Sequence, residues 1–276
     1  MTETIEAIEK LNKDLKKAAK VLTHAEVRYM VDNYYMVQQY RKSLGNQIRA
    51  LSESKEPNEL LTYIFEQTYT LEKNIKRALE LYTKKPDPVM EWCLAQPGIG
   101  PVITAGLMAH IDITKAPTVG NIWSFAGLDP TKKWGKGQKR PWNASLKVLC
   151  WKAGESFVKV SNKEDAFYGN EYKRRKEEEV RLNEELFFKD QAAEILETRN
   201  YKKDTIAYSH YIKGQLPPAH IHSRAKRYAV KLFLAHLHEV WYREHYGQAP
   251  PLPYPIAHQN HAHYIDPVDK TVKAVF

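Results

Sequence analysis

Residues 97–101 read Pro-Gly-Ile-Gly-Pro, between an apolar segment that ends at Leu94 and another that begins at Val102. Glycine permits backbone conformations that are closed to other residues, and the N-terminus of a helix exposes N–H groups that bind anions. We therefore interpret this segment as a hairpin between two short helices. Its backbone would contact a nucleic-acid phosphate through Gly98, Ile99, Gly100 and Val102. The alternative is a tight turn in which glycine is required only for steric reasons.

A strongly basic segment follows at residues 131–152, where seven Lys or Arg residues occur without a single Asp or Glu. Tryptophans are interleaved with these cations at positions 134, 142 and 151. A run of charge is often only a solvated surface, but so many uncompensated cations favour a polyanionic partner. The cations are Lys132, Lys133, Lys136, Lys139, Arg140, Lys147 and Lys152.

A second group of cations lies in the first turns of a helix expected over about residues 221–246. Cations near a helix N-terminus oppose the helix dipole, so this position indicates a role other than helix stability. Arg224 and Arg227 of this group are added to the candidate nucleic-acid contacts.

Metal and catalytic chemistry have weaker support in the sequence. Histidines are frequent in the last quarter, but they form no metal motif with Cys, Asp or Glu. A two-metal nuclease needs several carboxylates that converge, whereas Asp112 and Asp129 near the basic segment are isolated from each other in the sequence. These isolated aspartates are typical of caps and turns. We predict no catalytic residue, no metal and no cofactor. The histidines weighed as possible metal ligands are His220, His222, His236, His238, His258, His261 and His263.

Composition limits the class of protein. The chain has 276 residues, 43% of them hydrophobic, and a formal net charge of +9, which suits a globular protein with a polyanionic partner. No segment approaches the roughly 20 apolar residues of a membrane span, and no signal peptide opens the chain. Cys93 and Cys150 are far apart. We expect a cytoplasmic protein without a membrane partner.

The elements that would position these residues are helices. Apolar residues recur at helical spacing through residues 3–85, with a break at residues 52–57 (Ser-Glu-Ser-Lys-Glu-Pro). This pattern predicts an antiparallel helical hairpin or a short coiled coil, through which the chain would form a homo-oligomer. Arg41 interrupts the apolar seam, so we expect it to reach the edge of the seam or to meet an acid.

The predicted fold class is all-α, in three parts. Residues 1–85 form the helical arm, which ends at the Lys-Lys-Pro-Asp-Pro segment 84–88. Residues 89–160 form a compact module that carries the glycine hairpin and a helix at 153–160. Residues 161–276 contain a charged helix over 170–198, the basic helix and an extended arm at 248–255 (Gln-Ala-Pro-Pro-Leu-Pro-Tyr-Pro).

Residues 90–160 resemble the C-terminal domain of the DEDD-type insertion-sequence transposases, relatives of the Piv invertase. That family typically shows a P-G-I-G-P hairpin, then A-G-L-x-P, then a basic stretch that ends in G-N-x-x-L-R. Here the corresponding segments are residues 97–101, residues 126–130 (Ala-Gly-Leu-Asp-Pro) and residues 142–147 (Trp-Asn-Ala-Ser-Leu-Lys). Asn143 in the last segment joins the candidate contacts. The family has a helix-hairpin-helix-like motif at this hairpin.

The resemblance implies DNA binding in transposition or site-specific recombination, a context that includes structured guide RNA as a second partner. Family members also carry a RuvC-like domain with an acidic tetrad, and a nucleophilic serine that shortly follows A-G-L-x-P. In this chain helices occupy the place of that domain, and residues 131–135 (Thr-Lys-Lys-Trp-Gly) contain no serine. We therefore expect a DNA-binding protein without its own catalytic centre. The alternative is an RNA-binding scaffold whose tryptophans stack on unpaired bases.

Overall fold

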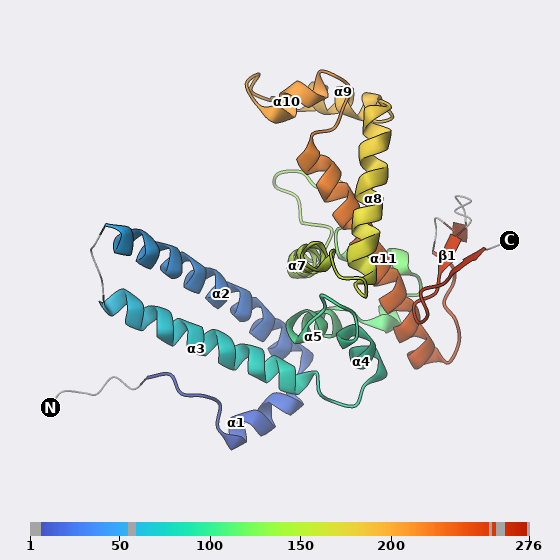
Figure 1. The fold of residues 1–276 in the computed structure, drawn as a ribbon. Helices are drawn as coiled ribbons and strands as arrows, with labels where there is room; N and C mark the ends of the chain where they lie inside the picture. The colour runs from blue at the N-terminus through green and yellow to red at the C-terminus, as the bar shows by residue number, and fades with distance from the viewer. Residues whose placement is uncertain (1–6, 55–58, 254–255, 258–262, 275–276) are drawn as a thin grey trace. The chain divides into compact units, whose positions relative to one another are not determined.

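The computed structural model describes residues 7–54, 59–253, 256–257 and 263–274, and the fold is all-α (Figure 1). The chain forms two compact units. Unit 1 contains residues 1–94 and 100–112, and unit 2 contains residues 95–99 and 113–276. This division differs from the predicted segments 1–85, 89–160 and 161–276. The helices on either side of the glycine hairpin belong with the arm, and the rest of the predicted middle module belongs with the C-terminal helices.

Unit 1 is built on two long antiparallel helices, α2 (His24–Glu53) and α3 (Glu59–Tyr82), which lie side by side in Figure 1. Thr23 and Glu26 form a capping box that begins α2. The expected helix over 3–85 is therefore interrupted before residue 24 as well as between α2 and α3. The segment before α2 contains only the short α1 (Lys13–Ala18) and the 3-10 helix η1 (Ala19–Val21).

Arg41 meets an acid, which is one of the two outcomes expected for a cation in an apolar seam. Its Nε atom forms an ion pair with the Glu72 carboxylate across α2 and α3. Gln38 also donates to Glu72, at 3.0 Å. Where α3 ends, α4 (Pro88–Leu94) and α5 (Pro101–His110) follow and complete the unit. Residues 102–109 of α5 are all buried, and α5 packs against both α2 and α3.

Unit 2 begins with η2 (Ile113–Lys115), α6 (Val119–Phe125) and α7 (Ala144–Val160). Next come α8 (Phe167–Glu184), α9 (Lys189–Thr198) and α10 (Ile206–Tyr211), and then the long α11 (Pro218–Tyr246). Residues 249–253 have no regular structure, as the proline-rich sequence predicts. The chain then forms a two-stranded antiparallel sheet of β1 (His263–Ile265) and β2 (Val272–Ala274), which the sequence analysis did not predict.

The core of unit 2 lies where α7 and α8 pack against α11. Phe157 of α7, Tyr168 of α8 and Phe233 of α11 are each at most 1% exposed, and their rings contact one another. The helices approach closely at Gly154 of α7, where a Cβ atom would lie 2.6 Å from the Cγ atom of Lys226. The predicted charged helix over 170–198 is in fact two helices, because the chain turns at Leu186, which has a φ of 59°.

Candidate nucleic-acid interface

The basic segment leaves α6 through a helix cap that explains the Ala-Gly-Leu sequence. Gly127 has a φ of +66°, its N–H bonds the Ser124 carbonyl, and the Leu128 N–H bonds the Trp123 carbonyl. These two bonds are those of a Schellman motif, which requires glycine at this position. Asp129 then accepts from the backbone N–H and the hydroxyl of Thr131, so this aspartate is a turn residue, as expected.

The loop between α6 and α7, light green in Figure 1, presents its cations to solvent. A turn over residues 135–138 places Lys136 at its tip, with Gly137 at a φ of +85°. The Trp134 indole N–H donates to the Gln138 carbonyl at 2.7 Å, and the Arg140 guanidinium lies 4.9 Å from the centre of the Trp134 ring. These contacts within the loop give it a defined local conformation. Its exposed cations are Lys132, Lys133, Lys136, Lys139 and Arg140.

Asn143 has a structural role. Its side-chain oxygen accepts from the Leu146 N–H at 2.8 Å, and its own N–H donates to the Phe125 carbonyl at 2.9 Å. It is therefore the N-cap of α7, which accounts for an asparagine three residues before a buried leucine. One turn into α7, the Lys147 ammonium lies 4.1 Å from the centre of the Trp142 ring.

The structure separates the two arginines that were predicted together on the basic helix. Arg224 is bound to the buried Glu179 of α8, with 2.5 Å between Arg224 Nε and Glu179 Oε2, and it also donates to Gln191. Lys226 is paired with Glu155 of α7. Arg227 is exposed, and no carboxylate of the described residues lies within 4 Å of it. Arg227, and not Arg224, is the arginine available to a ligand.

Arg227 and Lys147 line the same pocket, which has a volume of about 260 Å³. The residues around it include Gly127, Trp151 and Ser223, but no Asp or Glu. Lys147, like Arg227, has no carboxylate of the described chain within 4 Å. Lys147 of α7 and Arg227 of α11, 80 positions apart in the sequence, therefore meet at one pocket, whereas the five exposed cations of the loop do not line it.

The cations of this surface repel one another. Partial burial, followed by the positive charges of Arg140 and Arg227, lowers the pKa of Lys147. Partial burial, followed by the charge of Arg224, lowers the pKa of Arg227. Such repulsion disfavours the unbound state and is relieved when an anion binds. Burial also raises the pKa of the Cys150 thiol to about 12, so this residue at the pocket is protonated and is no nucleophile near neutral pH.

The two glycines of the hairpin have different roles. Gly98 has a φ of +94°, and its carbonyl accepts from the Ser156 hydroxyl at 2.5 Å, so it is a packed turn residue of unit 2. Gly100 has an extended backbone, caps α5 in unit 1, and would accommodate a Cβ without any contact within 4 Å. The side chains of Ile99 and Val102 are buried, so these two residues could contact a ligand only through their backbone.

Sequence reasoning missed Ser223, and it counted Trp151 only as part of the basic segment. Trp151 follows Lys147 by four residues, so helical spacing alone places both side chains on one face of α7. Ser223 precedes Arg227 by four residues on α11 in the same way. Their meeting across two helices depends on tertiary packing, for which the sequence carries no local signal.

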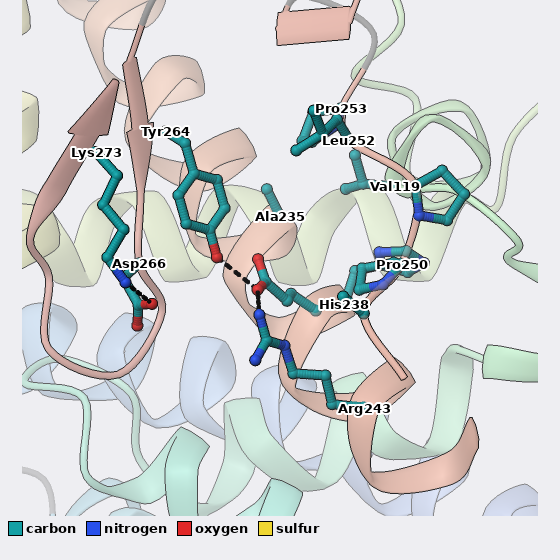
Figure 2. Close-up of a pocket in the computed structure, with 13 residues that line it drawn as sticks. Val119, Ala235, His238, Arg243, Pro250, Leu252, Pro253, Tyr264, Asp266 and Lys273 are labelled. Carbon is teal, nitrogen blue, oxygen red and sulfur yellow. Dashed lines mark hydrogen bonds and ion pairs between the residues drawn. The ribbon is translucent and has the colours of Figure 1, made fainter. Parts of the chain in front are cut away.

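A second pocket, of about 390 Å³, lies between the C-terminal half of α11, the proline-rich segment and the sheet (Figure 2). Its central group is the Glu239 carboxylate, whose Oε1 atom accepts from Tyr264 at 2.5 Å and from Arg243 at 2.6 Å. Asp266 pairs with Lys273 at 2.7 Å. The charges of this pocket are thus paired within the protein. They hold the strands against α11 and leave no excess positive charge for a polyanion.

The histidines within the described residues are dispersed. His236 bonds the Tyr168 hydroxyl, His222 bonds Tyr172, and His238 bonds the Ala116 carbonyl. Within the described ranges, no three His, Cys, Asp or Glu side chains come together as a metal site. His258 and His261 lie outside the described residues. None of the described helices has both the length and the apolar character to cross a membrane.

Comparisons of the chain with protein-family profiles, with curated proteins and with solved structures find no match.

Proposed function

We propose that this protein binds DNA through the basic loop, the N-terminal part of α7 and the exposed cations of α11. The observation that carries the proposal is the convergence of three cations. Lys147 and Arg227 line one pocket without an acid, and after partial burial the charges of Arg140 and Arg227 lower the pKa of Lys147. A dense array of phosphates is the ligand that compensates such a surface, and Lys and Arg are the residues that bind it.

The resemblance to the DEDD-type transposases adds to the proposal the process in which the protein would bind DNA. The protein would act in transposition or site-specific recombination as a DNA-binding component, without a catalytic centre of its own. The backbone of the glycine hairpin would add a contact at Gly100, which is accessible. Cys93 and Cys150 are free and buried, which suits the reducing cytoplasm that we propose as its location.

The test is a titration of a duplex oligonucleotide with the full chain and with Arg227→Gln. Loss of one phosphate contact should weaken binding about three- to tenfold at physiological salt. Arg199→Gln is the matched control, because Arg199 is also exposed on unit 2 and lies outside the pocket. Duplex affinity that is the same in all three proteins would contradict the proposed surface.

Structured RNA is the second candidate ligand, and the exposed indoles favour it. Trp134 and Trp151 are 45% and 52% exposed, and single strands stack on such rings. In a competition assay, DNA binding predicts that an unlabelled duplex displaces the labelled duplex at least as well as an RNA hairpin of equal length. Displacement by RNA alone would favour the scaffold function.

A further inference from the structure

The pocket between α7 and α11 is recessed, whereas the backbone of a DNA duplex is a convex surface. The exposed cations of the loop can contact the phosphates of a duplex at its surface. Lys147 and Arg227, in contrast, line a cavity of about 260 Å³. This volume is larger than one phosphate requires and is close to the lower end, about 300 Å³, of the range for small-molecule sites. A ligand that fills it must bring more than a phosphate into the pocket.

The polar groups of the pocket are suited to an anion. Lys147 and Arg227 are the two cations of the pocket without a carboxylate partner in the described chain, whereas Lys226 is neutralised by Glu155. Ser223 donates its hydroxyl proton to the Ala219 carbonyl at 2.8 Å, so the two cations and not this hydroxyl are the donors for an anion. Two cations and no acid select a group of negative charge, and phosphate accepts hydrogen bonds from both.

The wall of the pocket offers a ring for stacking. Trp151 is 52% exposed, although it lies in the middle of a helix whose opposite face is buried. The Lys226 ammonium lies 5.2 Å from the centre of its ring, and Lys226 is in turn held by Glu155. The indole is thus positioned by a neighbour at the same pocket. Such a ring stacks on any base, because every base has a π-face.

We propose that this pocket binds a single unpaired nucleotide of DNA, with its phosphate between Lys147 and Arg227 and its base on Trp151. This inference rests on the proposed DNA-binding function and makes it more specific. The paired strands would lie along the basic loop, and a nucleotide at a bulge or an overhang would enter the cavity. Recognition would depend on the absence of a pairing partner and not on the identity of the base.

The experiment compares a fully paired duplex with the same duplex carrying one bulged 2-aminopurine nucleotide. The wild-type protein should bind the bulged duplex about tenfold more tightly and should quench the 2-aminopurine fluorescence. In Trp151→Ala the ratio of the two affinities should fall to near one. Phe187→Ala is the matched control, because Phe187 is an exposed aromatic residue of unit 2 (70%) outside this pocket, and it should keep the ratio.

The outcomes separate this inference from the proposed function. If the wild-type protein binds both duplexes equally, the nucleotide pocket is wrong while DNA binding stands. If Trp151→Ala has an unchanged melting temperature and keeps the tenfold ratio, the pocket is likewise wrong. If the wild-type protein binds neither duplex, the proposed function fails. An RNA hairpin with the same bulge is the third arm, and tighter binding of that hairpin than of the bulged DNA would overturn the assignment to DNA.

Discussion

The Arg224 guanidinium of α11 binds the Glu179 carboxylate of α8, with 2.5 Å between Nε and Oε2, and Glu179 is only 2% exposed. Arg175 binds the other oxygen of the same carboxylate at 2.8 Å. This arrangement holds two arginines in the interior face of α8 and α11 and leaves Arg227, three residues further on, free of a carboxylate. The basic N-terminal half of α11 therefore has one structural arginine, Arg224, and one that is available for binding, Arg227.

Disruption of the Arg41–Glu72 pair should destabilise the protein, because it leaves a carboxylate in the seam between α2 and α3. Burial tends to raise the pKa of Glu72, but hydrogen bonds from Arg41 and Gln38 outweigh burial and lower it. Arg41→Leu should lower the free energy of unfolding by roughly 3 kcal/mol. The double variant Arg41→Leu/Glu72→Leu should recover most of this loss. Urea denaturation measures both, and equal losses in the single and double variants would show that the pair is not coupled.

His236 should make the protein sensitive to acid. Burial, with a smaller contribution from the Lys270 ammonium, lowers the pKa of His236 to about 3 from the value of 6.5 that is normal for an exposed histidine. Between these values the unfolded chain binds a proton that the folded protein does not, so stability falls as the pH falls. The expected loss from this residue is about 1.4 kcal/mol per pH unit.

The variant His236→Gln tests this directly. It should flatten the dependence of the melting temperature on pH between about 6 and 4, because Gln does not titrate there. The control is His24→Gln, since His24 is exposed at the start of α2 and should leave the curve unchanged. Parallel pH curves for His236→Gln and the wild type would rule out His236 as the cause.

The two glycines of the hairpin should respond differently to substitution. Gly98→Ala forces a side chain into a φ of +94° and places Cβ 3.3 Å from Ser156 Oγ, so it should cost about 1–2 kcal/mol of stability. Gly100→Ser should keep or slightly raise stability, because serine is a good N-cap and has room. The serine oxygen would, however, accept the N–H groups of the first turn of α5 that a phosphate would otherwise use.

DNA titrations on the same two variants therefore test the hairpin. If its backbone contacts DNA, Gly100→Ser should lose affinity while its melting temperature is maintained. Unchanged affinity in Gly100→Ser would leave the hairpin as a turn and restrict DNA binding to the basic surface.

We also propose that the protein self-associates through α2. Tyr29, Met36 and Tyr40 recur at seven- and four-residue spacing and are 69%, 63% and 53% exposed, which forms an apolar stripe along one side of the helix. Light scattering of the full chain should give a mass above that of one 32.1 kDa chain. The variant Tyr29→Ser/Met36→Lys/Tyr40→Ser should give the mass of one chain. A single-chain mass for the wild type at the highest attainable concentration would refute self-association.

The all-α class and most of the long helices follow from local patterns. The three-four spacing of apolar residues predicts α2, α3 and most of α11, and Gly98 and Gly100 predict the turn before α5. The expectation that Arg41 reaches the edge of the seam or meets an acid follows from the same spacing, but the spacing does not identify Glu72 as that acid. These features are determined by residues that are close together along the chain or that lie on one face of a helix.

The pairing of charges between helices could not be read from the sequence. Arg224 and Arg227 are the same type of residue in the same basic stretch of α11. Only the packing of α8 against α11 shows that Glu179 pairs with Arg224. Asn143 appears within a basic stretch as a candidate contact, yet the start of α7 uses its side chain as a cap. The strands β1 and β2 are too short to show an alternating pattern, and the Tyr264–Glu239 contact that holds them joins residues 25 positions apart.

The salt dependence of duplex binding tests the central claim most directly. Each phosphate contact contributes about 0.9 to the slope of log affinity against log salt concentration. The triple variant Lys132→Ala/Lys133→Ala/Lys136→Ala should reduce the slope by up to about 2.7. The triple variant Lys202→Ala/Lys203→Ala/Lys213→Ala removes the same charge from exposed positions of the same unit and should keep the wild-type slope. A wild-type slope near zero, or equal reductions in both variants, would contradict DNA binding through the basic loop.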